Sequence, residues 1–166
     1  MRIAFSTLGC PDFSWPEIYA MAKDLGFDGI ELRGLGDEIF TVKAPPFTDS
    51  ELPRTVQLLR RLHLSIPCLS SGCCLKNTDQ AGQNHDEVVA YLELARKLGT
   101  PYVRVLADRQ PRAEGEVDDS VVLEALQRLA PIAEAAGVTL LVETNGVYAD
   151  TARLTGLLNG VCSDAV

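Results

Sequence analysis

The feature that most constrains the fold is a repeated unit, in which a helical segment ends at a stop residue and a short apolar strand follows. Copies of this unit occupy residues 22–32, 95–105 and 133–142, with a weaker copy at 59–69. The stop residues Gly26, His63, Gly99 and Gly137 are separated by 37, 36 and 38 positions. Glycine suits the left-handed conformation that ends many helices. The pattern therefore indicates a repeated helix–strand unit.

The repeat predicts five short strands, each followed by a helix. The strands are expected at 3–6, 29–32, 64–69, 102–106 and 138–142. The helices are expected to end near 25, 62, 98, 136 and 158, with Asn159 and Gly160 ending the last one. Capping-box patterns at Ser14 and Thr48, and Asn84 as a cap, predict where the first three helices begin. Short right-handed connections between such units produce a parallel sheet covered by helices.

The length sets a limit on the architecture. With 166 residues, 46% of them hydrophobic, the chain suits one domain over residues 1–166 and is too short for two. A closed (β/α)8 barrel needs eight units and about 250 residues, whereas this repeat provides about five. The chain is therefore interpreted as a partial barrel of the α/β class. We expect a truncated piece of a longer protein; the alternatives are partial barrels that pair through their open sheet edges, and an open doubly wound sheet.

Composition excludes some classes of function. The net charge of -8 and the pI near 4.7 argue against a nucleic-acid-binding protein, which needs an excess of Lys and Arg. No run of 18 apolar residues and no signal-peptide pattern occurs, so no membrane partner and a cytoplasmic location are expected. Five cysteines without a metal-site or disulfide spacing are expected to be free thiols.

One carboxylate stands out as a candidate catalytic group. Residues 138–142 show no alternation of polar and apolar side chains, as in a strand buried on both faces, and Glu143 ends this strand. In parallel α/β folds, ligands bind beyond the carboxyl ends of the strands. Glu143 therefore faces a binding site, caps the next turn or pairs with a neighbouring arginine.

Other polar residues are expected near the same strand ends. Glu31 and Arg33 follow the second strand, where they either contact substrate hydroxyls or pair with one another. Arg104 lies inside a strand and needs a carboxylate partner, for which Glu31 and Glu143 are the candidates.

The third strand is expected to deliver further groups to this edge. Ser71 and Cys73 follow residues 64–69 and are candidate substrate contacts. The two histidines have local explanations, because His63 ends a helix and His85 follows a helix cap.

Four segments together carry a family resemblance. They are IAFSTL at 3–8, LGFDGIELR at 25–33, ARKLGTPYVRV at 95–105 and AGVTLLVET at 136–144. In this order the chain resembles the sugar phosphate isomerase/epimerase family, the xylose isomerase-like TIM barrels. The resemblance implies a (β/α)8 barrel that holds a divalent metal, manganese, magnesium, cobalt or zinc. It also implies that Glu143 is a metal ligand and an acid/base group.

The resemblance implies further ligands that this chain does not supply. An Asp, a His and a Glu from the sixth to eighth strand regions are expected beyond Val166. Since one carboxylate does not hold a catalytic divalent cation, we expect the chain alone to be inactive or very weak.

Three functions are compatible with this sequence. The first is a metal-dependent isomerase or epimerase of a sugar or sugar-like polyol, which removes a proton next to a carbonyl. The second is a phosphodiester hydrolase of the endonuclease IV type, against which only two His residues and the negative charge count. The third is a non-catalytic partial barrel that binds itself or a partner.

Overall fold

The computed structural model describes residues 1–166 and confirms an α/β fold with five strands and five helices. The strands are β1 Ala4–Ser6, β2 Gly29–Glu31, β3 Cys68–Cys74, β4 Tyr102–Leu106 and β5 Thr139–Glu143. The helices are α1 Trp15–Asp24, α2 Leu52–Leu62, α3 Ala81–Leu98, α4 Asp119–Ala136 and α5 Thr151–Val161. Short 3-10 turns occupy several of the connecting loops.

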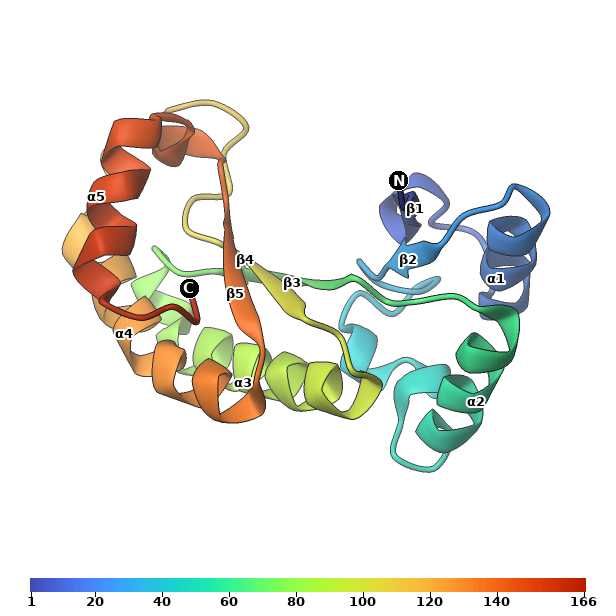
Figure 1. Cartoon of the computed structure of the whole chain (residues 1–166). Helices are drawn as coiled ribbons and strands as arrows, with labels where there is room; N and C mark the ends of the chain where they lie inside the picture. Colours follow the sequence, from blue (N-terminus) through green and yellow to red (C-terminus); the bar gives the residue numbers. More distant parts are fainter.

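All strand pairs are parallel, and the strands follow the order of the chain. β1 pairs with β2, and β3, β4 and β5 form a second sheet. Single bridges from Gly29 to Ser65 and from Leu32 to Leu69 join the two sheets. Figure 1 shows the resulting curved array, with β1 and β2 at one end and β5 at the other. This is a partial barrel, because the array does not close on itself.

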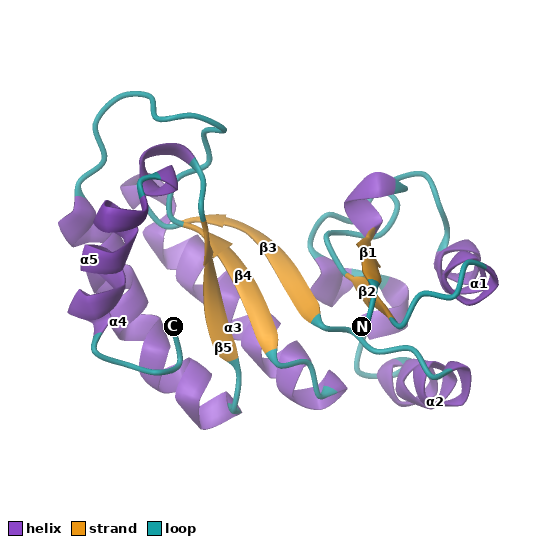
Figure 2. Cartoon of the chain, turned by 45° about the horizontal axis from the view of Figure 1, so that its top comes forward, coloured by secondary structure: helices purple, strands orange, loops and turns teal.

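The core lies between the strands and the helices. Val103, Val105 and Leu140 are fully or almost fully buried and belong to one apolar cluster with side chains of α3 and α4. Figure 2 shows these helices covering one side of the β3–β4–β5 sheet, while the other side is left open. On that side Leu141 and Tyr102 are exposed. The sheet is therefore half-covered, which differs from the interior of a closed barrel.

The helix stops predicted from the repeat are confirmed. Gly26 and Gly99 have φ of 73°, Gly137 has φ of 67°, and His63 adopts the same left-handed conformation with φ of 55°. At each position the chain leaves a helix and turns toward the next strand. Left-handed backbone is accessible to glycine at low cost, which explains why three of the four stops are glycines.

The third strand differs from the prediction. Residues 64–69 were expected to form it, but β3 begins at Cys68 and continues to Cys74. The register between β3 and β4 shifts between Ser70 and Cys74, so the strand contains a bulge. A bulge lets a strand run through glycine and small polar residues, which lack the apolar pattern that marks a buried strand.

Three helix boundaries also differ from the prediction. α2 begins at Leu52 after Glu51, and the Thr48 hydroxyl instead donates to the Pro45 carbonyl oxygen. α3 begins before Asn84, which is buried and donates to the Cys74 carbonyl oxygen. α5 runs through Asn159 and Gly160 to Val161. The Asn84 bond reaches backbone ten residues away, which a local capping pattern does not reveal.

The β5 edge is partly covered by the C-terminal segment. The amide of Leu140 donates to the carbonyl oxygen of Ala165 over 2.8 Å. The chain thus passes beside β5, on the side where a further strand would pair. None of the helices combines the length and apolarity that crossing a membrane requires.

Candidate active site

An ion pair between β4 and β5 marks the candidate site. Leu140 is buried among core side chains and Val142 packs against them, so the alternation of a strand turns Glu143 toward the open side. Arg104 aligns with exposed Leu141 and points the same way. Arg104 Nε lies 2.9 Å from Glu143 Oε2. We call this side of the β3–β4–β5 sheet, which carries Arg104, Leu141 and Glu143, the open face.

The Arg104 guanidinium is held by two strands. Its Nη1 donates to the Ser71 carbonyl oxygen over 2.9 Å, and the Ser71 hydroxyl donates to the Arg104 carbonyl oxygen over 3.0 Å. The side chain of Arg104 is 15% exposed, whereas that of Glu143 is 40% exposed. Glu143 Oε1 accepts no hydrogen bond from the chain, so this oxygen is free to meet a ligand. The predicted pairing of Arg104 with Glu143 is confirmed, and with it the alternative that Glu143 pairs with a neighbouring arginine.

A second carboxylate lies at the edge of the open face. The Ser70 hydroxyl donates to Glu31 Oε1, and Ser70 aligns with Arg104 across the sheet. Burial raises the pKa of the Cys68 thiol, the charge of Glu31 raises it further, and Arg104 opposes that rise. Through Ser70, the Glu31 carboxylate thus lies beside the strand position of Arg104.

Arg33 lies further along the same edge and does not pair with Glu31. Its backbone amide donates to the Thr7 hydroxyl over 2.8 Å, which anchors the start of the loop after β2. Its guanidinium nitrogens approach Gly72 in the β3 bulge. The alternative that Glu31 and Arg33 satisfy one another is thus contradicted, because the ion pairs of the chain do not include this one.

Ser71 and Cys73 do not reach the open face. Their side chains are 0% and 2% exposed, and the Cys73 Sγ lies 3.3 Å from the Ser71 Oγ. Burial raises the pKa of the Cys73 thiol to about 11. The register shift between Ser70 and Cys74 includes both residues. The alternation of residues 64–69 therefore does not predict which way their side chains point.

Asp108 is a polar residue of the site region that the sequence reasoning did not select. It follows β4, its side chain is 0% exposed, and Lys76 Nζ lies 2.6 Å from its Oδ1. The backbone amides of Gln110 and Val147 also donate to this carboxylate. Burial alone would raise the pKa of Asp108, but Lys76 and the two amides outweigh burial and leave it below its ordinary value.

Asp108 therefore fixes the loops that follow β3, β4 and β5. Gly146, with φ of 57°, packs directly against its carboxylate, where a Cβ would overlap it. Asp108 could have been selected from its position in the sequence, because it comes just after a predicted strand, as Glu143 does.

The chain alone does not present a metal site. No three His, Cys, Asp or Glu side chains are grouped so as to hold an ion. Glu143, the expected ligand, has one oxygen bound to Arg104. A hard divalent cation needs several oxygen donors from the protein, so the residues present do not fit one.

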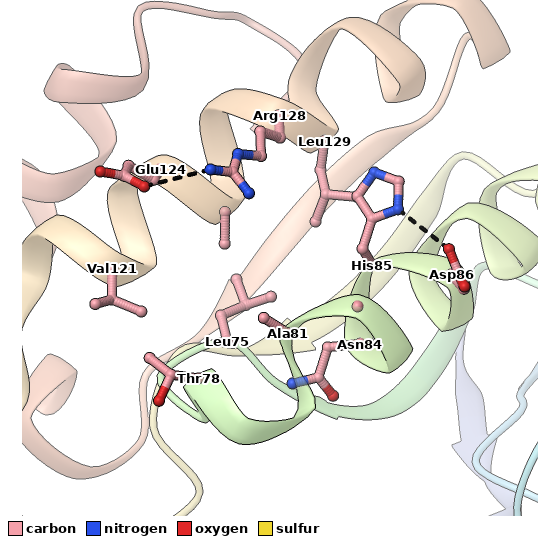
Figure 3. A pocket seen from close by; sticks show the side chains of 12 residues that line it. Leu75, Thr78, Ala81, Asn84, His85, Asp86, Val121, Glu124, Arg128 and Leu129 are labelled. Atoms are coloured by element: carbon pink, nitrogen blue, oxygen red, sulfur yellow. Dashed lines mark hydrogen bonds and ion pairs between the residues drawn. The ribbon is translucent and has the colours of Figure 1, made fainter.

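A cavity of about 420 Å³ lies away from these residues, between α3 and α4. Figure 3 shows Leu129 between Arg128 and His85, with Leu75 below them. His85 contacts Asp86 at 3.4 Å, and Arg128 contacts Glu124 at 3.5 Å. Both side chains thus contact a neighbouring carboxylate within the chain, and none of the candidate site residues lines this cavity.

Comparison with known proteins supports the fold. The model of a family described as xylose isomerase-like TIM barrel matches residues 19–165. Similar solved structures include the probable 3-DHS dehydratase AsbF involved in petrobactin synthesis from Bacillus anthracis (19% identity, TM-score 0.77). A xylose isomerase-like TIM barrel protein from Mycobacterium smegmatis, in complex with magnesium, has 17% identity and a TM-score of 0.78. An L-ribulose 3-epimerase has 23% identity and a TM-score of 0.75.

Each of these three alignments covers 99% of this chain. They cover 61%, 62% and 58% of the solved structures, respectively, so the chain spans about three fifths of their length. The curated proteins contain no match. At these identities the likeness establishes the fold alone.

Proposed function

Because this chain belongs to the xylose isomerase-like TIM-barrel family, we propose that its open face is part of an isomerase or epimerase site for a sugar or sugar-like polyol. The observation that carries the proposal is the Arg104–Glu143 pair, which holds a carboxylate at the carboxyl end of β5 with one oxygen free. This is the edge of a parallel sheet at which such folds bind their ligands.

In this proposal Glu143 moves the proton. Isomerisation or epimerisation next to a carbonyl removes a proton from carbon, and the resulting enediolate carries negative charge. Arg104 holds Glu143 Oε2 in an ion pair, which leaves Oε1 to accept the proton. Arg104 also places a permanent positive charge beside the developing enediolate.

Glu31 is proposed to bind substrate hydroxyls, with the buried Ser70 as its hydrogen-bond donor. Their hydrogen bond orients the Glu31 carboxylate, whose second oxygen can accept from a hydroxyl. A row of charged and hydroxyl groups on one strand edge suits a polyol, which presents several hydroxyls in succession.

The relative from Mycobacterium smegmatis is described in complex with magnesium, but no step is assigned to a metal in this chain. Its own residues group no three ligands. We therefore expect weak turnover from this chain by itself, carried by Glu143 and Arg104.

A lyase reaction is an alternative to isomerisation, because one similar structure is described as a probable 3-DHS dehydratase. An elimination next to a carbonyl begins with the same proton removal, so Glu143 would keep its role. The two chemistries differ in whether a hydroxyl leaves, which mass spectrometry of the product distinguishes.

A non-catalytic, self-associating partial barrel is the second candidate. Leu141 and Tyr102 are exposed on the open face, and apolar side chains on an uncovered sheet favour association. Sedimentation analysis of the chain and of the double substitution Leu141→Thr and Tyr102→Thr tests it. A defined dimer that becomes monomeric in the variant supports this candidate, whereas a monomer in both contradicts it.

The proposed site is tested by titrating the isotopically labelled chain with D-fructose, a neutral ketose, and following amide chemical shifts. Saturable shifts are expected at β2, β3 and β5, and Glu143→Gln is expected to weaken them. Glu134→Gln on the exposed surface of α4 is the matched control and is expected to change nothing. Shifts confined to other regions would contradict the proposed site.

A further inference from the structure

We propose that Arg33 and Arg109 form a subsite for an anionic group, a carboxylate or a phosphate, on the substrate. This inference rests on the proposed function and adds a feature of the substrate that the Arg104–Glu143 pair does not define. Glu143 acts on the carbon chain, whereas the two arginines would hold a charged substituent further along it.

The two guanidinium groups converge on Gly72 from different strands. Arg109 follows β4, and its Nη2 donates to the Gly72 carbonyl oxygen over 2.7 Å. Arg33 follows β2, and both of its terminal nitrogens lie 3.9 Å from the position that a Cβ of Gly72 would occupy. Because residue 72 is a glycine, it places no side chain of its own beside Arg33, and the nearest atom to that position is Glu87 Oε1 at 3.7 Å.

Neither arginine is neutralised by an ion pair. The ion pairs of the chain include Arg104 but not Arg33 or Arg109. The nearest carboxylate at Gly72 is that of Glu87, whose Oε1 accepts from the Gly72 amide over 2.9 Å. One negative charge beside two guanidinium groups leaves an excess of positive charge at this point of an otherwise acidic chain.

The geometry suits a substituent on a small sugar. Arg104 is bound to the Ser71 carbonyl oxygen and Arg109 to that of Gly72. These are consecutive residues of β3, so both arginines are anchored on the same segment of this strand. In this proposal the substrate has its reacting carbons at Glu143 and its charged end at Arg33 and Arg109. Guanidinium groups bind the oxygens of carboxylates and phosphates in a bidentate manner.

The test is a titration of the labelled chain with inorganic phosphate and, separately, with acetate, followed at the Gly72 amide. A saturable shift is expected with at least one anion. Arg33→Gln and Arg109→Gln are each expected to weaken it by about tenfold, because each removes a charge-assisted hydrogen bond. Arg112→Gln, in the exposed loop after β4, is the matched control and is expected to stay within about twofold of the unsubstituted chain.

A further variant keeps both arginines. Gly72→Asp places a carboxylate beside the Arg33 guanidinium, and the Cβ there meets only ordinary contacts, the nearest with Glu87 Oε1 at 3.7 Å. This variant is expected to abolish phosphate and acetate binding, because the protein then supplies the anion. The amide spectrum shows in the same experiment whether each variant is folded.

The two anions identify the substituent. A stronger response to phosphate indicates a phosphorylated substrate, and a stronger response to acetate indicates a sugar acid; both support the subsite. No saturable shift with either anion, or a shift that is unchanged in Arg33→Gln and Arg109→Gln, overturns it.

D-fructose separates this inference from the proposed function. Binding of D-fructose beside Glu143 without an arginine-dependent response to anions refutes the subsite and leaves the proposed function. A response to anions without D-fructose binding supports the subsite and refutes binding of a neutral polyol at Glu143.

Discussion

Arg104 and Glu143 project from adjacent parallel strands and meet at 2.9 Å on the open face of the β3–β4–β5 sheet. Arg104 also bonds the Ser71 carbonyl oxygen, so one guanidinium links three strands. The Glu143 carboxylate is thus fixed by residues of the chain itself, before any substrate or ion is bound.

The coupling between these two residues is measurable. Arg104→Lys keeps the charge, but a single ammonium group cannot reproduce both bonds of the guanidinium fork. In a double-mutant cycle with Glu143→Gln, we expect a coupling free energy of about 1 kcal/mol, modest because Glu143 is partly exposed. Urea unfolding measures it, and Arg96→Lys on the exposed surface of α3 is the control. Strictly additive effects would contradict a stabilising interaction between Arg104 and Glu143.

Asp108→Asn is expected to destabilise the chain. It leaves Lys76 without its partner and weakens the acceptor for the Val147 and Gln110 amides. Breaking a buried ion pair costs about 3 kcal/mol, and urea unfolding at neutral pH measures the loss. Asp164→Asn, on the C-terminal segment, is the control, because Asp164 is exposed and makes no ion pair. Equal stability of the two variants would show that Asp108 does not anchor the loops.

The contribution of Asp108 to the free energy of unfolding is expected to depend on pH. The pKa of Asp108 in the folded chain lies below its ordinary value, so the unfolded chain takes up the proton first as the pH falls. The stabilisation is complete above the ordinary pKa of Asp, about 3.9, and is lost as the pH falls through the folded value. The stability difference between the unsubstituted chain and Asp108→Asn should therefore be constant from pH 5 to 7 and shrink below about pH 4. A difference that grows on acidification would contradict this account.

Gly146→Ala and Gly156→Ala should have opposite effects. Gly146 has φ of 57° and its Cβ position overlaps the Asp108 carboxylate, so alanine there should cost about 2 kcal/mol or more. Gly156 lies in α5 with nothing within 4 Å of its Cβ position, so alanine there should stabilise by about 0.5–1 kcal/mol. Thermal unfolding of both variants measures the signs, and a neutral Gly146→Ala would show that the loop after β5 is not constrained as described.

The cysteines should differ in reactivity. Burial raises the pKa of Cys73 to about 11, whereas Cys162 is exposed. At pH 8 a thiol reagent is therefore expected to modify Cys162 first and Cys73 only after unfolding, because the thiolate is the reactive form. Peptide mass spectrometry after timed labelling identifies the order. Early labelling of Cys73 would mean that this side chain does reach a solvent-filled site.

The repeat made most of the fold predictable from the sequence. Helix stops at Gly26, Gly99 and Gly137 depend on local backbone conformation, which is encoded locally. The apolar run before Glu143 likewise identified β5 and the direction of its end. Parallel order then followed, because short right-handed connections leave few alternatives.

The parts that could not be predicted depend on contacts between distant residues. The bulge in β3 arises from pairing with β4, and it is this bulge that buries Ser71 and Cys73 and brings Gly72 to the arginines. The same holds for Asp108, whose partners Lys76 and Val147 lie in other loops. Periodicity within one segment contains no information on such pairings.

The most direct test of the account is proton exchange next to a carbonyl. D-fructose is incubated in D2O, with and without magnesium, with the unsubstituted chain, Glu143→Gln or Glu134→Gln, and deuterium at the carbons beside the carbonyl is followed by NMR. The account predicts slow exchange by the unsubstituted chain and Glu134→Gln, and at least about tenfold slower exchange by Glu143→Gln, since general acid–base groups contribute factors of this size or more. Equal rates in all three samples would contradict the role of Glu143.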